Sequence, residues 1–206
     1  VIPNPPIKEE DKKKKLDDSN EDPAPLINTG KIGDSSATNT PLYKKNKMNL
    51  KPIKSYDQGI SDLISKGTLV SVGDSSTNPN KFAASMTSAK LLKGKYYLHK
   101  DCAQSFKDWM GALDSKGVKY QITSAVRFGA NTGAGPHGYG LAVDFGNLFQ
   151  EVGGSTDLEK NKQARINSTT YKTIAEEGKN NGWYNPWRLS DAGGSMDELW
   201  HFEYWG

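Results

Sequence analysis

The chain has 206 residues, of which 34% are hydrophobic and 25% are charged, with a formal net charge of +3. This length and composition predict one globular domain with an additional segment, and the small net charge does not predict nucleic acid as a partner. No apolar run approaches the roughly 18 residues of a membrane span, and the single cysteine, Cys102, excludes an internal disulfide framework and a cysteine-rich zinc site. Because the first residue is Val1 rather than methionine, we expect a processed product or a piece of a longer polypeptide.

The N-terminal part of the chain has the composition of an arm rather than of a folded domain. Seven of the ten prolines lie in the first 52 residues, which contain one aromatic residue, Tyr43. Five lysines face seven acids over residues 1–22, and six lysines face one aspartate over residues 23–54. Such a segment buries too little apolar surface to offset its ordering entropy. We therefore predict a disordered or partner-bound arm over residues 1–54 and a folded domain over residues 55–206.

The first clear element in the predicted domain is a helix, which follows a loop-like stretch over residues 71–90. We expect Asp101 to be its N-cap, Gln104 to occupy the capping-box position and Gly117 to end it. Apolar residues recur along it at helical spacing and predict one buried stripe. These residues are Cys102, Phe106, Trp109, Met110 and Leu113.

Three strands and a second helix follow in chain order. Apolar residues alternate with polar ones over residues 118–126, which predicts a strand with Arg127 at its exit. A short strand is predicted over residues 140–145, a helix over residues 168–182, and an aromatic-rich strand over residues 198–205. The sum is an α+β fold with a small antiparallel sheet and flanking helices.

Two of the three histidines suit a catalytic zinc site, which needs three N or O ligands and one open position. His137, Asp144 and His201 supply such a set. His137 and Asp144 are seven residues apart, so one continuous strand would place them on opposite faces. Gly138 and Gly140 allow the chain to turn, so that the histidine comes from a loop and Asp144 from the strand, beside the small Ala142. The opposite face of that strand is predicted to pack in the core through Leu141, Val143 and Phe145.

Further polar residues near these ligands are candidates for catalysis. Glu198 lies three residues before His201, so it is expected in a turn or bulge, where its carboxylate can act as a general base towards water activated by the metal. Arg127 can offer N–H donors to a developing oxyanion, an effect of about 3 kcal/mol per donor. Glu203 is either an acceptor for His201 or an ordinary exposed carboxylate, and His99 is expected to be structural. Six C-terminal aromatic residues are expected mostly in the core, with the remainder lining a substrate groove: Trp183, Tyr184, Trp187, Trp200, Tyr204 and Trp205.

Two short patterns around these residues resemble those of the zinc D,D-peptidases. This family comprises D-alanyl-D-alanine carboxypeptidases and L-alanyl-D-glutamate endopeptidases, many of them bacteriophage endolysins. Its pattern S-x-H-x-x-G-x-A-x-D is matched from the histidine onwards and its E-x-W-H pattern is matched in full, within a resemblance that covers about residues 96–206. The matching residues are His137, Gly140, Ala142, Asp144, Glu198, Trp200 and His201.

The resemblance implies an α+β zinc peptidase domain that hydrolyses an amide bond in the stem peptides of bacterial peptidoglycan. It implies zinc ligands at His137, Asp144 and His201, a general base at Glu198 and a transition-state arginine at Arg127. Because a cell wall lies outside the cytoplasm, it also implies an extracellular or cell-envelope enzyme. Such an enzyme is either a released phage endolysin or a virion-associated lytic component whose N-terminal arm docks onto tail or baseplate proteins.

The sequence departs from the family pattern at Gly135, where serine is usual. In members that trim a terminal D-alanine, that serine hydroxyl helps to hold the substrate. Its absence favours an endopeptidase of the L-alanyl-D-glutamate type, and a D-alanyl-D-alanine carboxypeptidase stays an alternative. A second alternative is a non-catalytic, zinc-containing structural module of a larger assembly. Such a module needs the ligands but not Glu198 and Arg127, so the presence of both favours an enzyme.

Overall fold

The computed structural model describes the protein over residues 60–84, 92–127, 136–146, 148, 158–185 and 198–206. The arm predicted over residues 1–54, and its boundary with the domain, lie outside these residues and stay predictions. No helix in the described ranges is long and apolar enough to cross a membrane.

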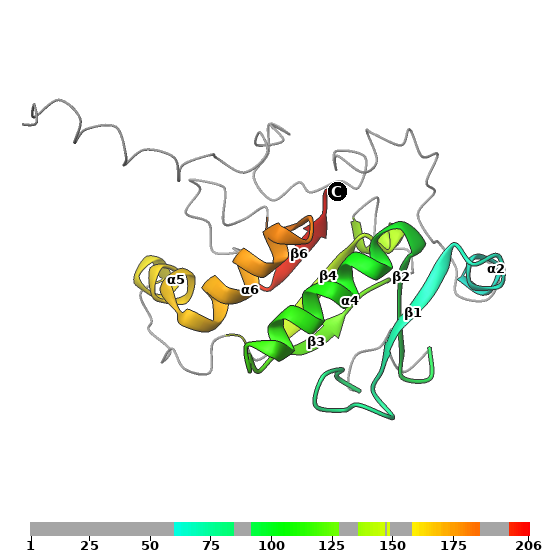
Figure 1. Cartoon of the computed structure of the whole chain (residues 1–206), viewed down its shortest axis with the longest axis horizontal. Helices are drawn as coiled ribbons and strands as arrows, with labels where there is room; N and C mark the ends of the chain where they lie inside the picture. The colour runs from blue at the N-terminus through cyan, green and yellow to red at the C-terminus, as the bar shows by residue number, and fades with distance from the viewer. Residues whose placement is uncertain (1–59, 85–91, 128–135, 147, 149–157, 186–197) are drawn as a thin grey trace, which may run out of the picture.

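Two antiparallel sheets and several helices make up the described fold, which confirms the predicted α+β class with flanking helices (Figure 1). The smaller sheet pairs β1 (Leu69–Asp74) with β2 (Lys95–His99). The larger sheet has the order β3-β4-β6-β5, formed by Gln121–Ser124, Ala142–Gly146, His201–Tyr204 and Trp183–Tyr184. The helical elements are α2 (Ser61–Ser65), α4 (Lys100–Ser115), the 3₁₀ helix η4 (Pro136–Tyr139), α5 (Leu158–Asn167) and α6 (Thr169–Asn180).

Helix α4 forms with the predicted stripe but begins differently. All five stripe residues are buried, and the chain leaves the helix at Gly117, which has a φ of +68°. The N-cap is His99 rather than Asp101: the His99 imidazole accepts a hydrogen bond from the Asp101 amide at 3.3 Å. Because β2 runs directly into α4, the chain has already turned at His99, and Asp101 lies in the first helical turn. Gln104 bonds Asp108 instead of the N-cap, so the predicted capping box was wrong.

The three predicted strands and the second helix all form, in shorter versions. The strand predicted over residues 118–126 is reduced to β3, where a change of register lies between Ile122 and Ser124. The strands predicted over residues 140–145 and 198–205 are β4 and β6. Helix α6 is capped by the Ser168 hydroxyl, which accepts from the Tyr171 amide.

Several of the elements that sequence patterns missed carry weak signals. Strand β1 begins two residues before the stretch predicted as a loop and continues into it, and only its first residue, Leu69, is buried. Strand β5 has two residues. Helix α5 has the strongly polar sequence LEKNKQARIN, which does not form an apolar stripe.

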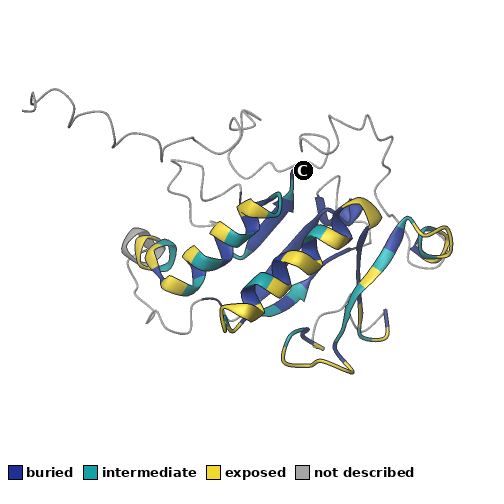
Figure 2. Cartoon of the chain, viewed as in Figure 1, coloured by how far each residue is buried: buried dark blue, intermediate teal, exposed yellow. Residues whose placement is uncertain are grey.

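The main core lies between α4, α6 and the larger sheet. In Figure 1 the two helices lie side by side in front of the strands, and Figure 2 shows their buried positions on the side towards the sheet. At the centre is Trp109, whose side chain is fully buried and whose ring packs on Trp183, Phe145 and Phe202 with centroid distances of 5.6, 5.0 and 5.3 Å. Phe145 and Phe202 each adjoin a residue predicted to bind the metal, so this core supports the two strands that carry those residues.

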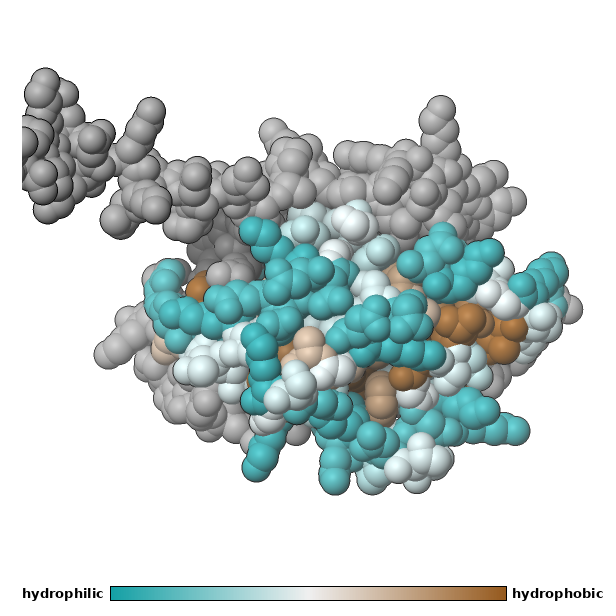
Figure 3. Space-filling model, in the orientation of Figure 1, coloured by the Kyte–Doolittle hydropathy of each residue, from teal (hydrophilic) through white to brown (hydrophobic). Residues whose placement is uncertain are grey.

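A second, smaller apolar cluster joins α2 to the smaller sheet. Its buried members are packed against the partly buried Leu63 and Ile64. In Figure 3 apolar residues gather on the side of α2 and β1, whereas hydrophilic residues cover most of the rest of that face. The buried members are Ile60, Leu69, Leu92, Tyr97 and Val126.

Cys102 should not react with thiol reagents in the native protein. It is fully buried, and its Sγ–H donates to the carbonyl oxygens of His99 and Gly140 at 3.2 and 3.4 Å. Burial raises the pKa of this thiol well above its ordinary value, so it holds almost no reactive thiolate. Titration with a chromogenic disulfide should detect no thiol in the folded chain and one after denaturation. Rapid reaction of the folded chain would contradict the close contact between α4 and the turn at Gly140.

Candidate metal centre

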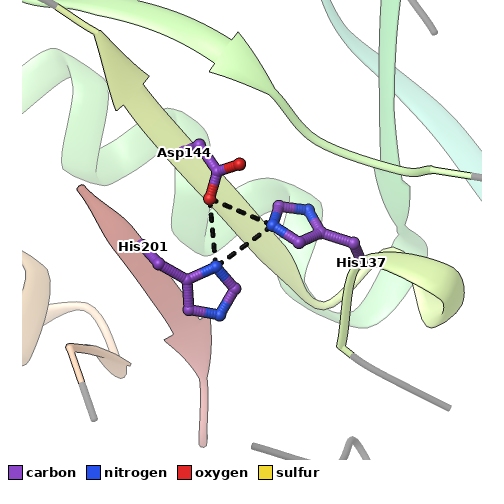
Figure 4. A group of neighbouring side chains, drawn as sticks. All are labelled: His137, Asp144 and His201. Carbon is purple, nitrogen blue, oxygen red and sulfur yellow. Dashed lines mark hydrogen bonds and ion pairs between the residues drawn. The ribbon is translucent and has the colours of Figure 1, made fainter. Parts of the chain in front are cut away.

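Three buried side chains from separate segments converge on the face of the larger sheet opposite α4 and α6. His137 comes from η4, Asp144 from the middle of β4, and His201 from the first position of β6 (Figure 4). Asp144 and His201 are direct partners across the β4–β6 pair. The Asp144 Oδ1 atom lies 3.0 Å from both His137 Nε2 and His201 Nδ1, and the two nitrogens are 3.1 Å apart.

The turn after His137 forms as the glycines predict. The Gly140 amide donates to the His137 carbonyl, and Gly140 has a φ of +69°, a conformation that side-chain-bearing residues rarely adopt. A Cβ atom at Gly140 would also lie 2.8 Å from the His99 backbone nitrogen. After the turn, Leu141, Val143 and Phe145 join the core cluster, as predicted, and Asp144 faces away from it.

The donor set fits a zinc ion. With ligand distances of about 2.0–2.1 Å, tetrahedral zinc holds its ligand atoms about 3.3 Å apart, close to the separations of 3.0–3.1 Å found here. The His137 Nδ1–H donates to the Ala125 carbonyl at 2.6 Å, which leaves the Nε2 lone pair towards Asp144. Burial, with smaller contributions from the charges of His201 and Arg127, holds the pKa of His137 well below its usual value. His137 is therefore neutral, as a metal ligand must be.

Arg127 lies beside the candidate ligands, at the exit of β3. Its Nε–H donates to the Ser124 hydroxyl at 2.7 Å, and its terminal Nη2 pairs with Asp144 Oδ2, the carboxylate oxygen that does not face the histidines. The Arg127 side chain keeps 38% of its surface exposed. Burial lowers the pKa of Arg127, and the negative charge of Glu198 opposes this shift. Arg127 is thus close to the site, and its action on a substrate oxyanion stays a prediction.

Glu198 lies in the predicted turn, directly before β6. Its carbonyl accepts from the His201 amide at 2.9 Å, which sets the turn against the strand that carries His201. The side-chain amide of Asn185 donates to the carbonyls of Glu198 and Leu199 at 3.2 and 2.8 Å. Asn185 is buried and follows β5. Sequence reasoning missed Asn185, because no pattern shows which distant turn an asparagine will hold.

The other residues considered from sequence occupy structural positions. His99 is buried and caps α4, in agreement with the structural role expected of it. Trp183 and Trp205 are buried, whereas Tyr184, Trp200 and Tyr204 are partly buried, and position 187 lies outside the described residues.

Comparisons with known proteins leave the family open. No protein-family model matches this sequence, and no curated protein matches it. One solved structure with a partial likeness is described as "Structure of the LdcB LD-carboxypeptidase reveals the molecular basis of peptidoglycan recognition". It has a TM-score of 0.44 and 16% sequence identity, and the match covers 68% of this chain and 68% of that chain. A likeness of this degree does not assign an activity, so membership in the zinc D,D-peptidases stays a prediction from the motifs.

Proposed function

We propose that this protein is a zinc-dependent peptidoglycan hydrolase that cleaves an amide bond of the stem peptides. The observation that carries the proposal is the convergence of His137 Nε2, Asp144 Oδ1 and His201 Nδ1 within 3.1 Å of one another, with Arg127 at the same carboxylate. Two neutral imidazoles and one carboxylate are the ligands of hydrolytic zinc sites that keep a position open for water or substrate. The motif resemblance supplies the substrate class.

The chain's own residues supply the remaining chemistry. Bound zinc would contribute Lewis acidity, which lowers the pKa of a water molecule from about 15.7 towards about 7. Glu198, in the turn held by Asn185, accepts the proton of the attacking water and delivers it to the leaving amine. Arg127 donates N–H groups to the oxygen of the scissile carbonyl as negative charge develops there. The proposal therefore needs Glu198 and Arg127 as well as the ligands.

The finer assignment rests on sequence. Gly135 in place of the usual serine supports endopeptidase cleavage of the L-alanyl-D-glutamate type over removal of a terminal D-alanine. A peptidoglycan substrate places the enzyme in the cell envelope or outside the cell. The division of the arm into an acidic part and a basic part supports a docking role, as in a virion-associated lysin, with a released endolysin as the other form of the same proposal.

Mass spectrometry of peptidoglycan fragments tests the proposal directly. The full chain should release new fragments from purified peptidoglycan, a chelator should abolish them, and added zinc should restore them. The fragment masses then distinguish a cut between L-alanine and D-glutamate from a cut at a cross-link or at a terminal D-alanine. If a zinc-loaded chain releases no fragments, the hydrolase proposal is wrong; if release persists without metal, the metal mechanism is wrong.

A further inference from the structure

A second buried carboxylate lies outside the ligand set and contacts one of the candidate ligands, His201, on the side of its ring away from the other two. Glu203 lies on β6, two residues after His201 and on the same face of the strand, and only 2% of its surface is exposed. Its Oε1 atom lies 3.2 Å from His201 Nε2, and its Oε2 atom accepts from the Trp205 indole N–H at 3.1 Å. The two carboxylate oxygens therefore each have a defined partner.

The contact with Glu203 sets which nitrogen of His201 can bind a metal. An ionised carboxylate only accepts hydrogen bonds, and carboxylates face both ring nitrogens of His201: Glu203 at Nε2 and Asp144 at Nδ1. When a cation lies between Asp144 and Nδ1, the proton of His201 lies on Nε2, where Glu203 accepts it, and the lone pair lies on Nδ1. Nδ1 is the atom that faces Asp144 and His137. With the proton on Nδ1 instead, His201 would present an N–H group to the site and could not be a ligand.

His137 is held in the complementary way, which indicates that the arrangement belongs to the site. Its Nδ1–H donates to the Ala125 carbonyl, so Nε2 carries the lone pair. One histidine thus presents Nε2 and the other Nδ1, and each outer nitrogen has its own buried acceptor. Histidine ligands of metals generally donate their other N–H to a carboxylate or carbonyl in this manner.

Among the described residues, the neighbours of Glu203 leave room for its side chain, and none is a lysine or arginine paired with it. Its partner across the β4–β6 pair is Ala142, whose small side chain lies on the same face. Within the described residues Glu203 has no ion pair with lysine or arginine; its ion-pair partner is His201. A buried carboxylate without a cation is unfavourable. A divalent cation on His201 Nδ1 would supply a positive charge that no lysine or arginine of the described ranges brings to this carboxylate.

We propose that Glu203 is a positioning residue of the metal centre: it holds the proton of His201 on Nε2, turns Nδ1 towards the metal, and is itself held by Trp205. This inference rests on the proposed function, because it assigns Glu203 a role at that same site. It predicts that Glu203 contributes to metal affinity without touching the metal or the substrate.

Nuclear magnetic resonance of the histidine side chains tests the orientation in the zinc-loaded full chain. The chain has three histidines, so long-range proton–nitrogen spectra are simple to assign. Near neutral pH, His137 should carry its proton on Nδ1, whereas His201 should carry it on Nε2. In Glu203→Leu, which has no acceptor, the resonance of the His201 Nε2–H proton should move upfield because its hydrogen bond is lost. In Glu203→Gln, whose carbonyl still accepts, this resonance should move much less.

Zinc affinity, measured by competition with a chromogenic chelator, tests the consequence. Glu203→Gln keeps the hydrogen bond but loses the charge and should weaken zinc binding about 10-fold, whereas Glu203→Leu should weaken it towards 100-fold. Trp205→Phe removes the indole donor and should have a smaller effect in the same direction. Glu176→Gln removes an exposed carboxylate from α6 and is the matched control, with unchanged affinity.

The outcomes separate this inference from the proposed function. Zinc binding by Glu203→Leu at wild-type affinity, or a zinc-loaded wild-type chain with the His201 proton on Nδ1, would overturn the role of Glu203. A wild-type chain that binds zinc but cleaves no peptidoglycan would instead overturn the proposed function, and the affinity and the Nε2–H resonance would still decide whether Glu203 orients His201. If Glu203→Leu does not fold, Glu203→Gln retains the test through its predicted 10-fold effect.

Discussion

Replacing Glu198 with glutamine should lower the rate of peptidoglycan cleavage by about 10²–10⁴-fold and leave zinc bound. Glutamine has nearly the same shape as glutamate but cannot accept a proton from water at neutral pH. The backbone bonds that hold the turn, from the His201 amide and the Asn185 side chain to the Glu198 carbonyl, do not depend on the carboxylate. The turn should therefore persist in the variant.

The measurement is the initial rate of fragment release, together with the zinc content of the purified variant. Glu176→Gln makes the same change of charge at an exposed position of α6 and should retain the wild-type rate. A wild-type rate in Glu198→Gln would rule out Glu198 as the general base. Loss of zinc from this variant would instead make Glu198 a ligand. If neither the wild type nor the variant cleaves peptidoglycan while both bind zinc, the non-catalytic module becomes the better interpretation.

Replacing Trp109 with alanine should lower the free energy of unfolding by about 3–5 kcal/mol. The indole is fully buried between α4 and the larger sheet, and its ring centroid lies 5.0 Å from that of Phe145 and 5.3 Å from that of Phe202. Its removal leaves a large cavity and also leaves the Ile174 carbonyl without the indole N–H that bonds it at 3.1 Å. Single domains are stable by roughly 5–15 kcal/mol, so this one change removes a large part of the total.

Urea denaturation followed by circular dichroism measures the effect. Trp109→Phe keeps most of the ring volume but loses the N–H donor, so it should be less destabilising than alanine and serves as the matched variant. Tyr184→Phe, at a partly buried position on β5, should change stability little. A loss below about 1 kcal/mol for Trp109→Ala would mean that α4 does not pack on the sheet in this way.

The buried face of helix α4, the turn after His137 and the type of the candidate site follow from local sequence. Apolar residues at helical spacing determine which face of α4 is buried, because that period places them on one side of any helix. The turn after His137 follows from Gly140, whose positive φ other residues rarely adopt. The type and spacing of His137, Asp144 and His201 point to a metal site, because few residue types bind zinc.

The tertiary structure decided where these local features begin and which atoms meet. His99 replaces Asp101 as the N-cap of α4 because strand β2 leads straight into the helix. The extent of β2 is determined by its pairing with β1. The sequence of strand β1 gives almost no strand pattern, since most of its residues are only partly buried.

The same limit applies at the metal centre. His137 and His201 are 64 residues apart, and the nitrogens that face each other depend on the register between β4 and β6 and on the acceptors at the Ala125 carbonyl and Glu203. Sequence reasoning left Glu203 open between an acceptor and an exposed carboxylate, and its burial against His201 decides this. The contact of Asn185 with the turn at Glu198 likewise joins separate segments. Local patterns determine conformation and residue type, whereas contacts between distant segments depend on how the whole chain packs.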